Sequence, residues 1–360
     1  MAPPGELPVK TAALTGVREI TMRDVPVPRV ESDDDVLIAV RSVGVCGSDI
    51  HYYATGRIGN QIVRYPFTVG HECAGVVEKT GAGVSRFKPG DRVAVEPAMP
   101  CYICDQCRAG RPHTCRNLKF LGCPGQACGC LSEYIVMPQK SCLPLPETVD
   151  FDGGAFSEPF AIGMYAVRQS VPMRGASVGI LGAGPIGLSV LFAAQAEGAR
   201  AVYMTDRLEY RAAFACRVGA TWAGNPESRD VVSTILRAEP EGLDVVFECC
   251  GRQEAIDTGM ELLKPGGKLM VIGIPGFERF SMPADLMRRK EICVQNVRRQ
   301  NGCAEAALEA VSRGIVPVAT LCTHSFPFDR TAEAFEVVAG YRDGVIKAMI
   351  HLNRLSRTHP

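Results

Sequence analysis

The sequence predicts an α/β protein of two parts, in which a β-rich part is combined with a doubly wound parallel sheet. Three observations predict this fold class. The chain has 360 residues, which is too long for one ordinary domain and suits two that each bury a core. Short valine-rich segments bounded by Gly, Pro and Asp fill the first half. After about residue 157, strand-like runs alternate with helix-like runs, as in βαβ units.

The β-rich part is expected to contain short strands at residues 36–45, 74–78 and 92–95. Turns are expected at the Gly-Ala-Gly run 81–83 and at the Pro-Gly-Asp run 89–91. Glycine and proline favour turns there because glycine tolerates positive φ and proline presets φ. We therefore expect the first half to be mainly β-structure.

The second part is expected to alternate regularly between strands and helices. The expected strands are 177–181, 201–205, 244–248 and 268–272, and the expected helices are 185–197, 208–218 and 253–263. A turn at Pro265-Gly266-Gly267 is expected before the last of these strands. Beyond about residue 297 we expect a helix at 304–311, a strand at 346–351 and loosely held residues at 352–360.

Charge and hydropathy argue against two classes of partner. Lys and Arg together number 39, as do Asp and Glu, so the formal net charge is zero. Such a chain has no long-range field that attracts nucleic acid or an anionic membrane, and we expect neither as a partner. Residues 176–196 are apolar enough to suggest a membrane span, but glycines and Pro185 in their middle favour a buried strand, a turn and a helix.

The chain has sixteen cysteines, which is a high number. Disulfide scaffolds are small, and the N-terminus has no apolar run of signal-peptide length. We therefore expect a reducing compartment, the cytoplasm, with some cysteines as metal ligands and others as small buried apolar residues.

A glycine-rich turn predicts a dinucleotide site. The run Gly182-Ala183-Gly184-Pro185-Ile186-Gly187 fits G-x-G-x-x-G, follows an expected strand and opens an expected helix. Gly182 makes the turn, Gly184 lets the backbone approach a pyrophosphate, and Gly187 lets the helix pack on the strand. The N–H groups at the start of the helix, around Pro185 and Ile186, then face the phosphates.

The cofactor predicted for this turn is NAD. Asp206 ends the next expected strand, where a carboxylate can hold both hydroxyls of the adenosine ribose and would repel a 2′-phosphate. Arg207 and Arg211 lie close by in the sequence and could soften this preference, so NADP is the less favoured alternative.

Four cysteines predict a structural zinc site. Cys101, Cys104, Cys107 and Cys115 lie at spacings from which thiolates can close a tetrahedral site. Four thiolates leave no open position for water or substrate, so this site is expected to be structural. Cys123, Cys128 and Cys130 follow closely, and we interpret them as packing residues.

A nucleic-acid zinc module is a rival interpretation of this loop. The loop carries more basic than acidic residues, namely Arg108, Arg111, Arg116 and Lys119 against Asp105. The neutral chain and the single loop argue against that interpretation.

Three further motifs contain residues that could act in catalysis or bind a metal. They lie far apart in the sequence, so their spacing alone does not assign them to one site. They are the run Cys46-Gly47-Ser48-Asp49-Ile50-His51, the run Gly70-His71-Glu72 and the pair Glu158-Pro159. A lone cysteine or histidine is more often a buried structural residue than a ligand.

Taken together, the motifs resemble a known family. GVCGSDIHYY, GHECAG, PGDRV, the four-cysteine loop, SEPFAIG and GAGPIG occur in this order in the zinc-dependent medium-chain alcohol dehydrogenases. Within that family the chain is similar to the sorbitol, xylitol and arabinitol dehydrogenase branch. The resemblance covers nearly the whole chain. It implies a GroES-like catalytic domain at 1–157 and 297–360, a Rossmann NAD-binding domain at 158–296, and a homotetramer or dimer.

The resemblance also implies the residues of a catalytic zinc site, and so two zinc ions per chain. Cys46 and His71 match zinc ligands, and Glu72 matches a glutamate that ligates zinc in the polyol branch. Glu158 stands where ordinary alcohol dehydrogenases have a cysteine ligand, and in polyol enzymes this glutamate ligates zinc or holds its water. Which of the two glutamates ligates directly stays open. Asp49 is expected to orient the His71 ring.

The substrate implied by the resemblance is a polyol. Tyr52 and Arg298 match residues that contact the polyol chain, alongside Glu158. Arg299 departs from the branch, because it stands where the sugar-alcohol enzymes have an aromatic residue. The segment after Cys115 is also shorter and is expected to lack their aromatic residue. Both departures make the expected pocket more polar or cationic.

The implied reaction is oxidation of a secondary alcohol to a ketone, with hydride transfer to NAD. Zinc polarises the hydroxyl, and the proton leaves through Ser48 and then His51 or water. Rival interpretations are a threonine, butanediol, simple alcohol, inositol or sugar-acid dehydrogenase of the same family, and a catalytically silent zinc- and nucleotide-binding relative.

Overall fold

The computed structural model describes residues 8–352, which fall into two compact units. The first unit comprises Met1–Glu158 and Leu308–Pro360, and the second comprises Pro159–Ala307. The expected domain boundaries, after residues 157 and 296, stay a prediction. The residues expected to be loosely held lie, apart from Leu352, outside the described part of the chain.

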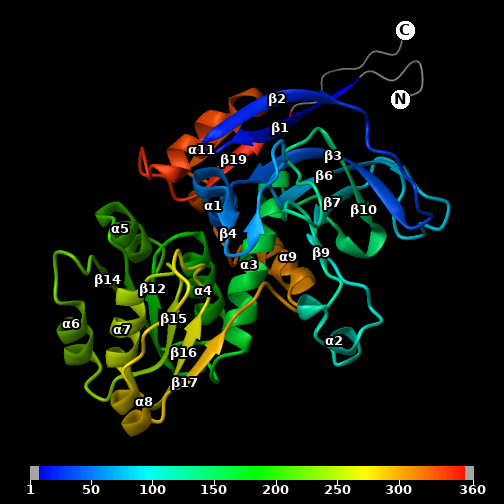
Figure 1. The fold of residues 1–360 in the computed structure, drawn as a ribbon. Helices are drawn as coiled ribbons and strands as arrows, with labels where there is room; N and C mark the ends of the chain where they lie inside the picture. Colours follow the sequence, from blue (N-terminus) through cyan, green and yellow to red (C-terminus); the bar gives the residue numbers. More distant parts are fainter. Residues whose placement is uncertain (1–7, 353–360) are drawn as a thin grey trace. The chain divides into compact units, whose positions relative to one another are not determined.

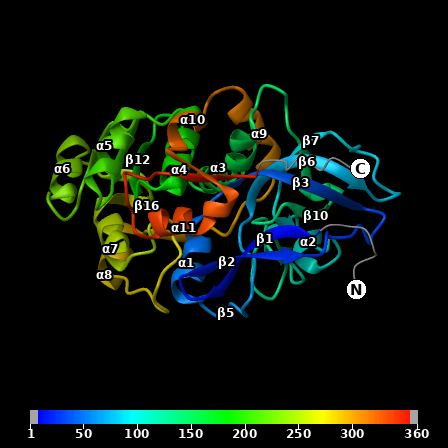
Figure 2. The same cartoon turned by 90° about the horizontal axis from the view of Figure 1, so that it is seen from above.

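The first unit is built on a seven-stranded sheet in the order β11-β7-β6-β3-β19-β18, with β10 also paired to β3. Figure 2 labels β7, β6, β3 and β10 of this sheet. Its strands are β3 (Asp35–Gly44), β6 (Glu72–Thr80), β7 (Arg92–Val95), β10 (Tyr134–Pro138), β11 (Cys142–Pro144), β18 (His324–Pro327) and β19 (Ala348–His351). The pair β18 and β19 is parallel and the other pairs are antiparallel. The three strands expected in this half match β3, β6 and β7.

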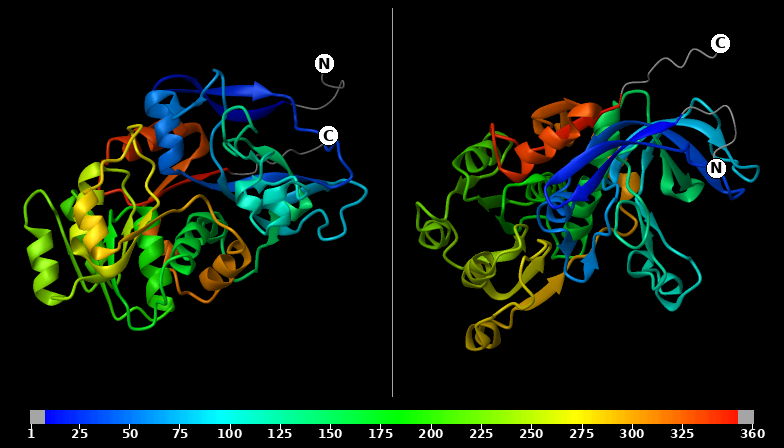
Figure 3. Two further views of the ribbon diagram at one scale, coloured as in Figure 1. Left: turned by 60° about the horizontal axis from the view of Figure 1, so that its bottom comes forward. Right: turned by 45° about the horizontal axis from the view of Figure 1, so that its top comes forward.

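Smaller elements complete the first unit. Three two-stranded sheets are formed by β1 (Val9–Gly16) with β2 (Glu19–Val25), β4 (Arg57–Ile58) with β5 (Gln61–Ile62), and β8 (Ala98–Met99) with β9 (Lys119–Phe120). Figure 3 shows β1 and β2 as a long ribbon. The helices are α1 (Gly47–Thr55), α2 (Asp105–Arg108), η1 (Pro112–Thr114), η2 (Gln139–Ser141), α10 (Val318–Leu321), η3 (Phe328–Arg330) and α11 (Thr331–Ala339).

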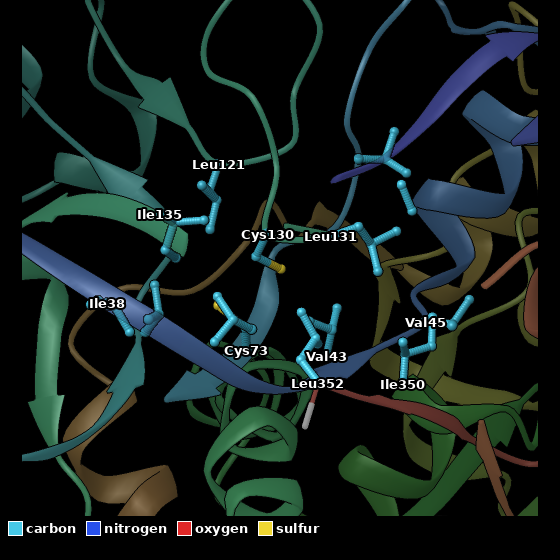
Figure 4. Packing of buried hydrophobic residues seen from close by; sticks show 14 of the residues in the cluster. Ile38, Val43, Val45, Cys73, Leu121, Cys130, Leu131, Ile135, Ile350 and Leu352 are labelled. Atoms are coloured by element: carbon cyan, nitrogen blue, oxygen red, sulfur yellow. The ribbon is translucent and has the colours of Figure 1, made fainter. Parts of the chain in front are cut away.

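The core of the first unit lies against β3 and β6. Alternate residues of β3, such as Ile38 and Val40, are at most 2% exposed and pack with Cys73 of β6 and with Leu131. Figure 4 shows Cys73 and Cys130 together in this core. Cysteine behaves there as a small apolar residue.

The second unit contains a parallel six-stranded sheet in the order β14-β13-β12-β15-β16-β17. Its strands are β12 (Ser177–Leu181), β13 (Ala201–Thr205), β14 (Trp222–Gly224), β15 (Leu243–Glu248), β16 (Leu263–Val271) and β17 (Cys293–Asn296). β12 lies in the middle, with β13 on one side and β15 on the other, so the strand order reverses beside it. This order confirms the expected doubly wound Rossmann sheet.

Helices cover this sheet. They are α4 (Pro185–Ala196), α5 (Glu209–Arg217), α6 (Val231–Ala238), α7 (Gln253–Leu262) and α8 (Ala284–Lys290). Helices α3 (Phe151–Arg168) and α9 (Ala304–Ser312) each run from one unit into the other. Right-handed crossovers place α4 and α7 on opposite faces, as Figure 1 shows. The strands β12 and β13 are buried along their whole length because both faces are covered.

Two expectations for this unit have clear outcomes. The apolar stretch 176–196 forms β12 and α4, and no described helix is both long and apolar enough to cross a membrane. The strand expected at 268–272 begins earlier, at Leu263. The expected turn at Pro265–Gly267 lies inside it, where four residues from Lys264 to Gly267 interrupt the register with β15.

Candidate active site and nucleotide-binding turn

The first half of the candidate active site forms where β3 leads into α1. Cys46 is the residue before α1, and its N–H donates to Asp49 Oδ2 at 3.3 Å. A carboxylate in the first turn of a helix is favoured by the helix dipole. The Ser48 hydroxyl donates to Cys46 Sγ at 3.3 Å. Helix α1 therefore presents a sulfur with a hydroxyl directly beside it.

The second half comes from the start of β6. Glu72 pairs in register with Gly44, the last residue of β3, which brings His71 and Glu72 next to Cys46. One ligand atom each of Cys46, His71 and Glu72 lie within 4.8 Å of one another. A thiolate, an imidazole and a carboxylate form a donor set that suits zinc.

Asp49 holds His71 in place. Asp49 Oδ1 lies 3.4 Å from His71 Nδ1 and accepts a hydrogen bond from the Gly70 N–H at 3.2 Å. Burial alone would lower the pKa of His71, but Asp49 and Cys46 together raise it well above its ordinary value. With Nδ1 engaged by a carboxylate, Nε2 is the nitrogen available to a metal.

Lys347 is a buried partner of Glu72 that no sequence motif indicates. Lys347 Nζ forms an ion pair with Glu72 Oε2 and donates to the Val45 carbonyl at 3.0 Å. Both side chains are 1% exposed. Gly44 makes room for the pair, because a Cβ at that position would overlap Glu72 Oε2 and Lys347 Cε. The available signal was a lysine within the apolar run Val345–Ile350.

Glu158, on α3, differs from Glu72 in its surroundings. It is 7% exposed, and its Oε2 is buried with no hydrogen-bond partner among the described residues. Burial raises the pKa of Glu158 to about 8, an effect that Glu72 adds to and His71 opposes. Glu158 is not among the residues whose ligand atoms meet within 4.8 Å.

The other predicted residues of α1 lie on one side of the helix. Ser48, His51 and Tyr52 are three and four positions apart, a spacing that places them on one helix face. Burial lowers the pKa of His51, which favours its neutral form. Tyr52 is buried, and its hydroxyl donates to Gln61 Oε1 at 3.0 Å.

An aromatic side chain packs on one of the candidate metal ligands. The ring of Phe120, in the segment after Cys115, lies 5.4 Å from the ring of His71. That this segment lacks the aromatic residue of the sugar-alcohol enzymes stays a prediction. Phe120 sits in the two-residue strand β9, which pairs with β8. The residue was visible in the sequence, but its packing on His71 depends on a pairing that no periodic pattern indicates.

The four-cysteine loop forms a compact sulfur cluster. The ligand atoms of Cys101, Cys104, Cys107 and Cys115 lie within 4.8 Å of one another, and this set suits a closed zinc site. Backbone N–H groups of Arg116 and Cys107 lower the pKa of Cys104 to about 6, which favours the thiolate.

Arg116 of the same loop forms an ion pair with Asp105. Arg116 pairs with Asp105 through Nε at 2.5 Å and Nη2 at 2.8 Å, so this arginine is already bound to the loop's own acid.

Cys123 and Cys130 are buried as expected of packing residues, whereas Cys128 is exposed, so that interpretation of Cys128 is wrong.

In the second unit, the glycine-rich turn joins β12 to α4. Gly182 has φ of +108°, and a Cβ at Gly187 would lie 1.8 Å from the Gly182 carbonyl oxygen. A side chain at Gly182 would be strained by the positive φ, and a side chain at Gly187 would collide with the backbone of the turn. Gly184 precedes α4 and Pro185 is its first residue, with Ile186 following.

Asp206 lies beside this turn. Its Oδ2 accepts from the Ala183 N–H at 2.8 Å, and its Oδ1 accepts from the Leu208 N–H at 2.9 Å. The carboxylate therefore joins the turn after β12 to the turn after β13, at the end of the sheet where dinucleotides bind.

The predicted arginines have different environments. Arg207 forms an ion pair with Glu227, whereas Arg211 is buried, with Nη1 3.4 Å from where a Cβ on Gly184 would lie. Arg298 is exposed, and Arg299 is half-buried with φ of +56°, a conformation rare for a residue with a side chain. Both lie in the second unit, whereas Tyr52 belongs to the first.

Two family profiles match the chain. The alcohol dehydrogenase GroES-like domain matches residues 32–147, and the zinc-binding dehydrogenase domain matches residues 185–313. The chain belongs to the zinc-dependent medium-chain alcohol dehydrogenase family. It is an oxidoreductase, and zinc and a nicotinamide cofactor fit the sites described above.

Named relatives support this membership over most of the chain. Sorbitol dehydrogenase of Bacillus subtilis is 34% identical over 96% of this chain and 98% of its own length. D-xylulose reductase A of Aspergillus oryzae is 34% identical over 94% of this chain and 96% of its own. The structure of a zinc-binding dehydrogenase from Sinorhizobium meliloti bound to NADP superposes with a TM-score of 0.88 at 30% identity, covering 96% of this chain and all of that one.

Proposed function

We propose that this protein oxidises a secondary hydroxyl of a polyol to a ketone and passes the hydride to NAD. The observation that carries this proposal is the polar character of the metal cluster. One thiol, one imidazole and one carboxylate meet there, and the buried Glu158 carboxyl interacts electrostatically with His71 and Glu72. The similarity to a sorbitol dehydrogenase and a D-xylulose reductase supports the same substrate class.

We assign the catalytic zinc to Cys46, His71 and Glu72. Lys347 holds Glu72 Oε2, so Oε1 is the oxygen available to the metal. Zinc bound there would act as a Lewis acid that lowers the pKa of a substrate hydroxyl. Glu158, with its pKa raised to about 8, would exchange a proton or a hydrogen bond with water or substrate near neutral pH.

The proton route that we propose starts at Ser48. Because its hydroxyl hydrogen is donated to Cys46 Sγ, the Ser48 oxygen offers its lone pairs to a substrate hydroxyl. As Ser48 accepts the substrate proton, its own hydroxyl hydrogen would turn away from Cys46 Sγ and pass, directly or through water, to His51. His51 lies three residues further on the same helix, and its lowered pKa keeps it neutral and able to accept that proton. Tyr52 on the same face would contact the rest of the substrate, and a substrate contact by Arg298 and Arg299 stays a prediction from sequence.

We infer that NAD is preferred over NADP. The Asp206 carboxylate would repel a 2′-phosphate, and Arg207 is paired with Glu227 rather than available to that phosphate. A nicotinamide cofactor held at this turn would accept the hydride.

Further properties belong to the same proposal. Four sulfurs in one cluster and three donors in another support two zinc ions per chain. A homotetramer or dimer in the cytoplasm, with no nucleic-acid or membrane partner, stays a prediction from sequence.

The test is NAD reduction measured with pentitols, hexitols, inositols, amino alcohols and simple alcohols. The proposal predicts that a five- or six-carbon polyol exceeds ethanol and 2-propanol in kcat/KM by about 10⁴-fold, because simple alcohols leave buried polar groups unpaired. Equal turnover of simple alcohols and polyols would contradict the substrate assignment.

A further inference from the structure

Beside the metal cluster lies a hydrogen-bonded trio of side chains from three separate segments. The Tyr52 hydroxyl donates to Gln61 Oε1 at 3.0 Å, and Gln61 Nε2 donates to Cys123 Sγ at 3.0 Å. Tyr52 Oη and Cys123 Sγ are 3.8 Å apart. Tyr52 comes from α1, Gln61 from β5 and Cys123 from the loop after β9. Tyr52 and Cys123 are buried, whereas Gln61 is half-buried.

Helix α1 places this trio next to the metal cluster. Ser48, which contacts Cys46 Sγ, lies four residues before Tyr52, so both side chains project from the same helix face. Tyr52 therefore begins one helical turn from Ser48, the residue that contacts the sulfur of the metal cluster.

The loop that carries Cys123 approaches the same region from the other side. The Phe120 ring packs on His71, and a Cβ on Gly122 would lie only 2.5 Å from the Gly70 carbonyl oxygen. Leu121 anchors the loop in the core (Figure 4). Cys123, one residue after Gly122, is held against the segment that supplies His71.

The amide of Gln61 has unused hydrogen-bonding capacity after these contacts. A primary amide carries two N–H donors and an oxygen with two lone pairs. Among the residues that the structure describes, Tyr52 uses one lone pair and Cys123 accepts from one N–H, so each end of the amide keeps one further group. Together these groups can bind a hydroxyl, which donates and accepts at once, or two neighbouring hydroxyls. An alkyl chain satisfies neither group.

We propose that Gln61 is a specificity-determining residue, whose amide is oriented by Tyr52 and Cys123 to bind a substrate hydroxyl away from the reacting carbon. This inference rests on the proposed function and names a determinant within it. The alternative is that Gln61 only fastens the β4–β5 hairpin to α1. The two differ in what they predict for substrates with and without extra hydroxyls.

The test compares Gln61→Leu with the wild type, using a five-carbon polyol and 2-butanol as substrates for NAD reduction. Leucine keeps the approximate size and removes the amide. The inference predicts that the ratio of kcat/KM for the polyol to that for 2-butanol falls by about tenfold for each hydrogen bond lost, mainly through KM.

Gln253→Leu is the matched control. Gln253 is also half-buried, and its amide bonds Asp257 and Ser281 in the second unit. Its ratio should equal that of the wild type.

Two further variants keep the inference testable if Gln61→Leu does not fold. Gln61→Glu keeps the acceptor for Tyr52 but removes both N–H donors, and Cys123→Ala leaves the amide without its sulfur partner. Each should lower the same ratio. Equal losses for both substrates, or an unchanged ratio in folded variants, would overturn the inference in favour of a structural role. A wild type that oxidises no polyol would overturn the proposed function as well.

Discussion

Lys347 and Glu72 form an ion pair inside the first unit, where each side chain is 1% exposed. The pair joins the residue before β19 to the first residue of β6, next to the candidate metal ligands Cys46 and His71. A buried pair contributes little net stability when both members are present, but losing one member leaves the other charge uncompensated. The pair therefore fixes the orientation of the Glu72 carboxylate.

Lys347→Met should destabilise the protein by about 3–5 kcal/mol, because the Glu72 carboxylate loses its buried partner. Urea unfolding measures this change, and metal analysis of the folded variant should show weakened zinc retention. Lys347→Arg, which keeps the charge, should recover most of both. Lys10→Met removes an exposed lysine paired with Asp24 and serves as the control, with an expected cost below about 1 kcal/mol. A Lys347→Met variant no less stable than Lys10→Met would argue against the role of the pair.

A second ion pair predicts a pH dependence of stability. His351 Nε2 on β19 lies 2.9 Å from Asp152 Oδ1 on α3. The hydrogen bond to Asp152 is the main factor that raises the pKa of His351, and burial opposes it. A group whose folded pKa lies above its unfolded value stabilises fully below the unfolded pKa, about 6.5 for histidine. We expect this contribution to be lost as the pH rises through the folded pKa of His351.

The acid of the pair follows the opposite rule. Burial alone would raise the pKa of Asp152, but hydrogen bonds from His351 and Ser42 lower it. Its contribution is present above the unfolded pKa and is lost as the pH falls through the folded pKa. Unfolding midpoints at about pH 5.5 and about pH 8.5 should differ less in His351→Gln than in the wild type. His324→Gln is the control, since His324 Nδ1 contacts the neighbouring Thr323 hydroxyl. An unchanged pH profile in His351→Gln would remove this pair as its cause.

Sequence predicted some parts of this molecule to the residue and missed others for a physical reason. β12 and β13 were expected at their observed bounds, because a short apolar run between glycines and polar residues is a local signal. The contact between Lys347 and Glu72 joins residues 275 positions apart, and no local pattern encodes it. The hydrogen bonds of Gln61 likewise depend on the packing of separate loops, since Cys123 lies 62 positions away.

The four-cysteine cluster predicts a separation of stability from chemistry. Cys104→Ser removes a donor from a set of four that meet within 4.8 Å, away from the Cys46 cluster. The variant should unfold at lower temperature and retain about one zinc per chain, with kcat per folded molecule largely kept, because a structural zinc stabilises the fold without touching substrate. Metal analysis after dialysis and thermal unfolding measure both. His71→Ala should show the reverse, with turnover lost and the fold kept. Loss of turnover in fully folded Cys104→Ser would place this cluster in the reaction.

The contacts of Asp206 and Arg207 predict how cofactor preference can be changed. Asp206 accepts from the Ala183 and Leu208 N–H groups, and Arg207 is held by Glu227. Asp206→Ser should lower kcat/KM for NAD about tenfold, since the ribose loses a charged hydrogen-bond partner. Its gain with NADP should be modest on its own, because Arg207 stays paired with Glu227. Adding Glu227→Gln frees Arg207 to bind a 2′-phosphate, and a charge-assisted hydrogen bond of this kind improves kcat/KM for NADP by a further factor of about 10 to 100. Glu227→Gln alone is the control and should change the NADP to NAD ratio little, because the Asp206 carboxylate still repels the phosphate. Steady-state kinetics with both cofactors in the three variants measure these ratios. A double variant that kept the wild-type preference would show that neither residue selects the cofactor.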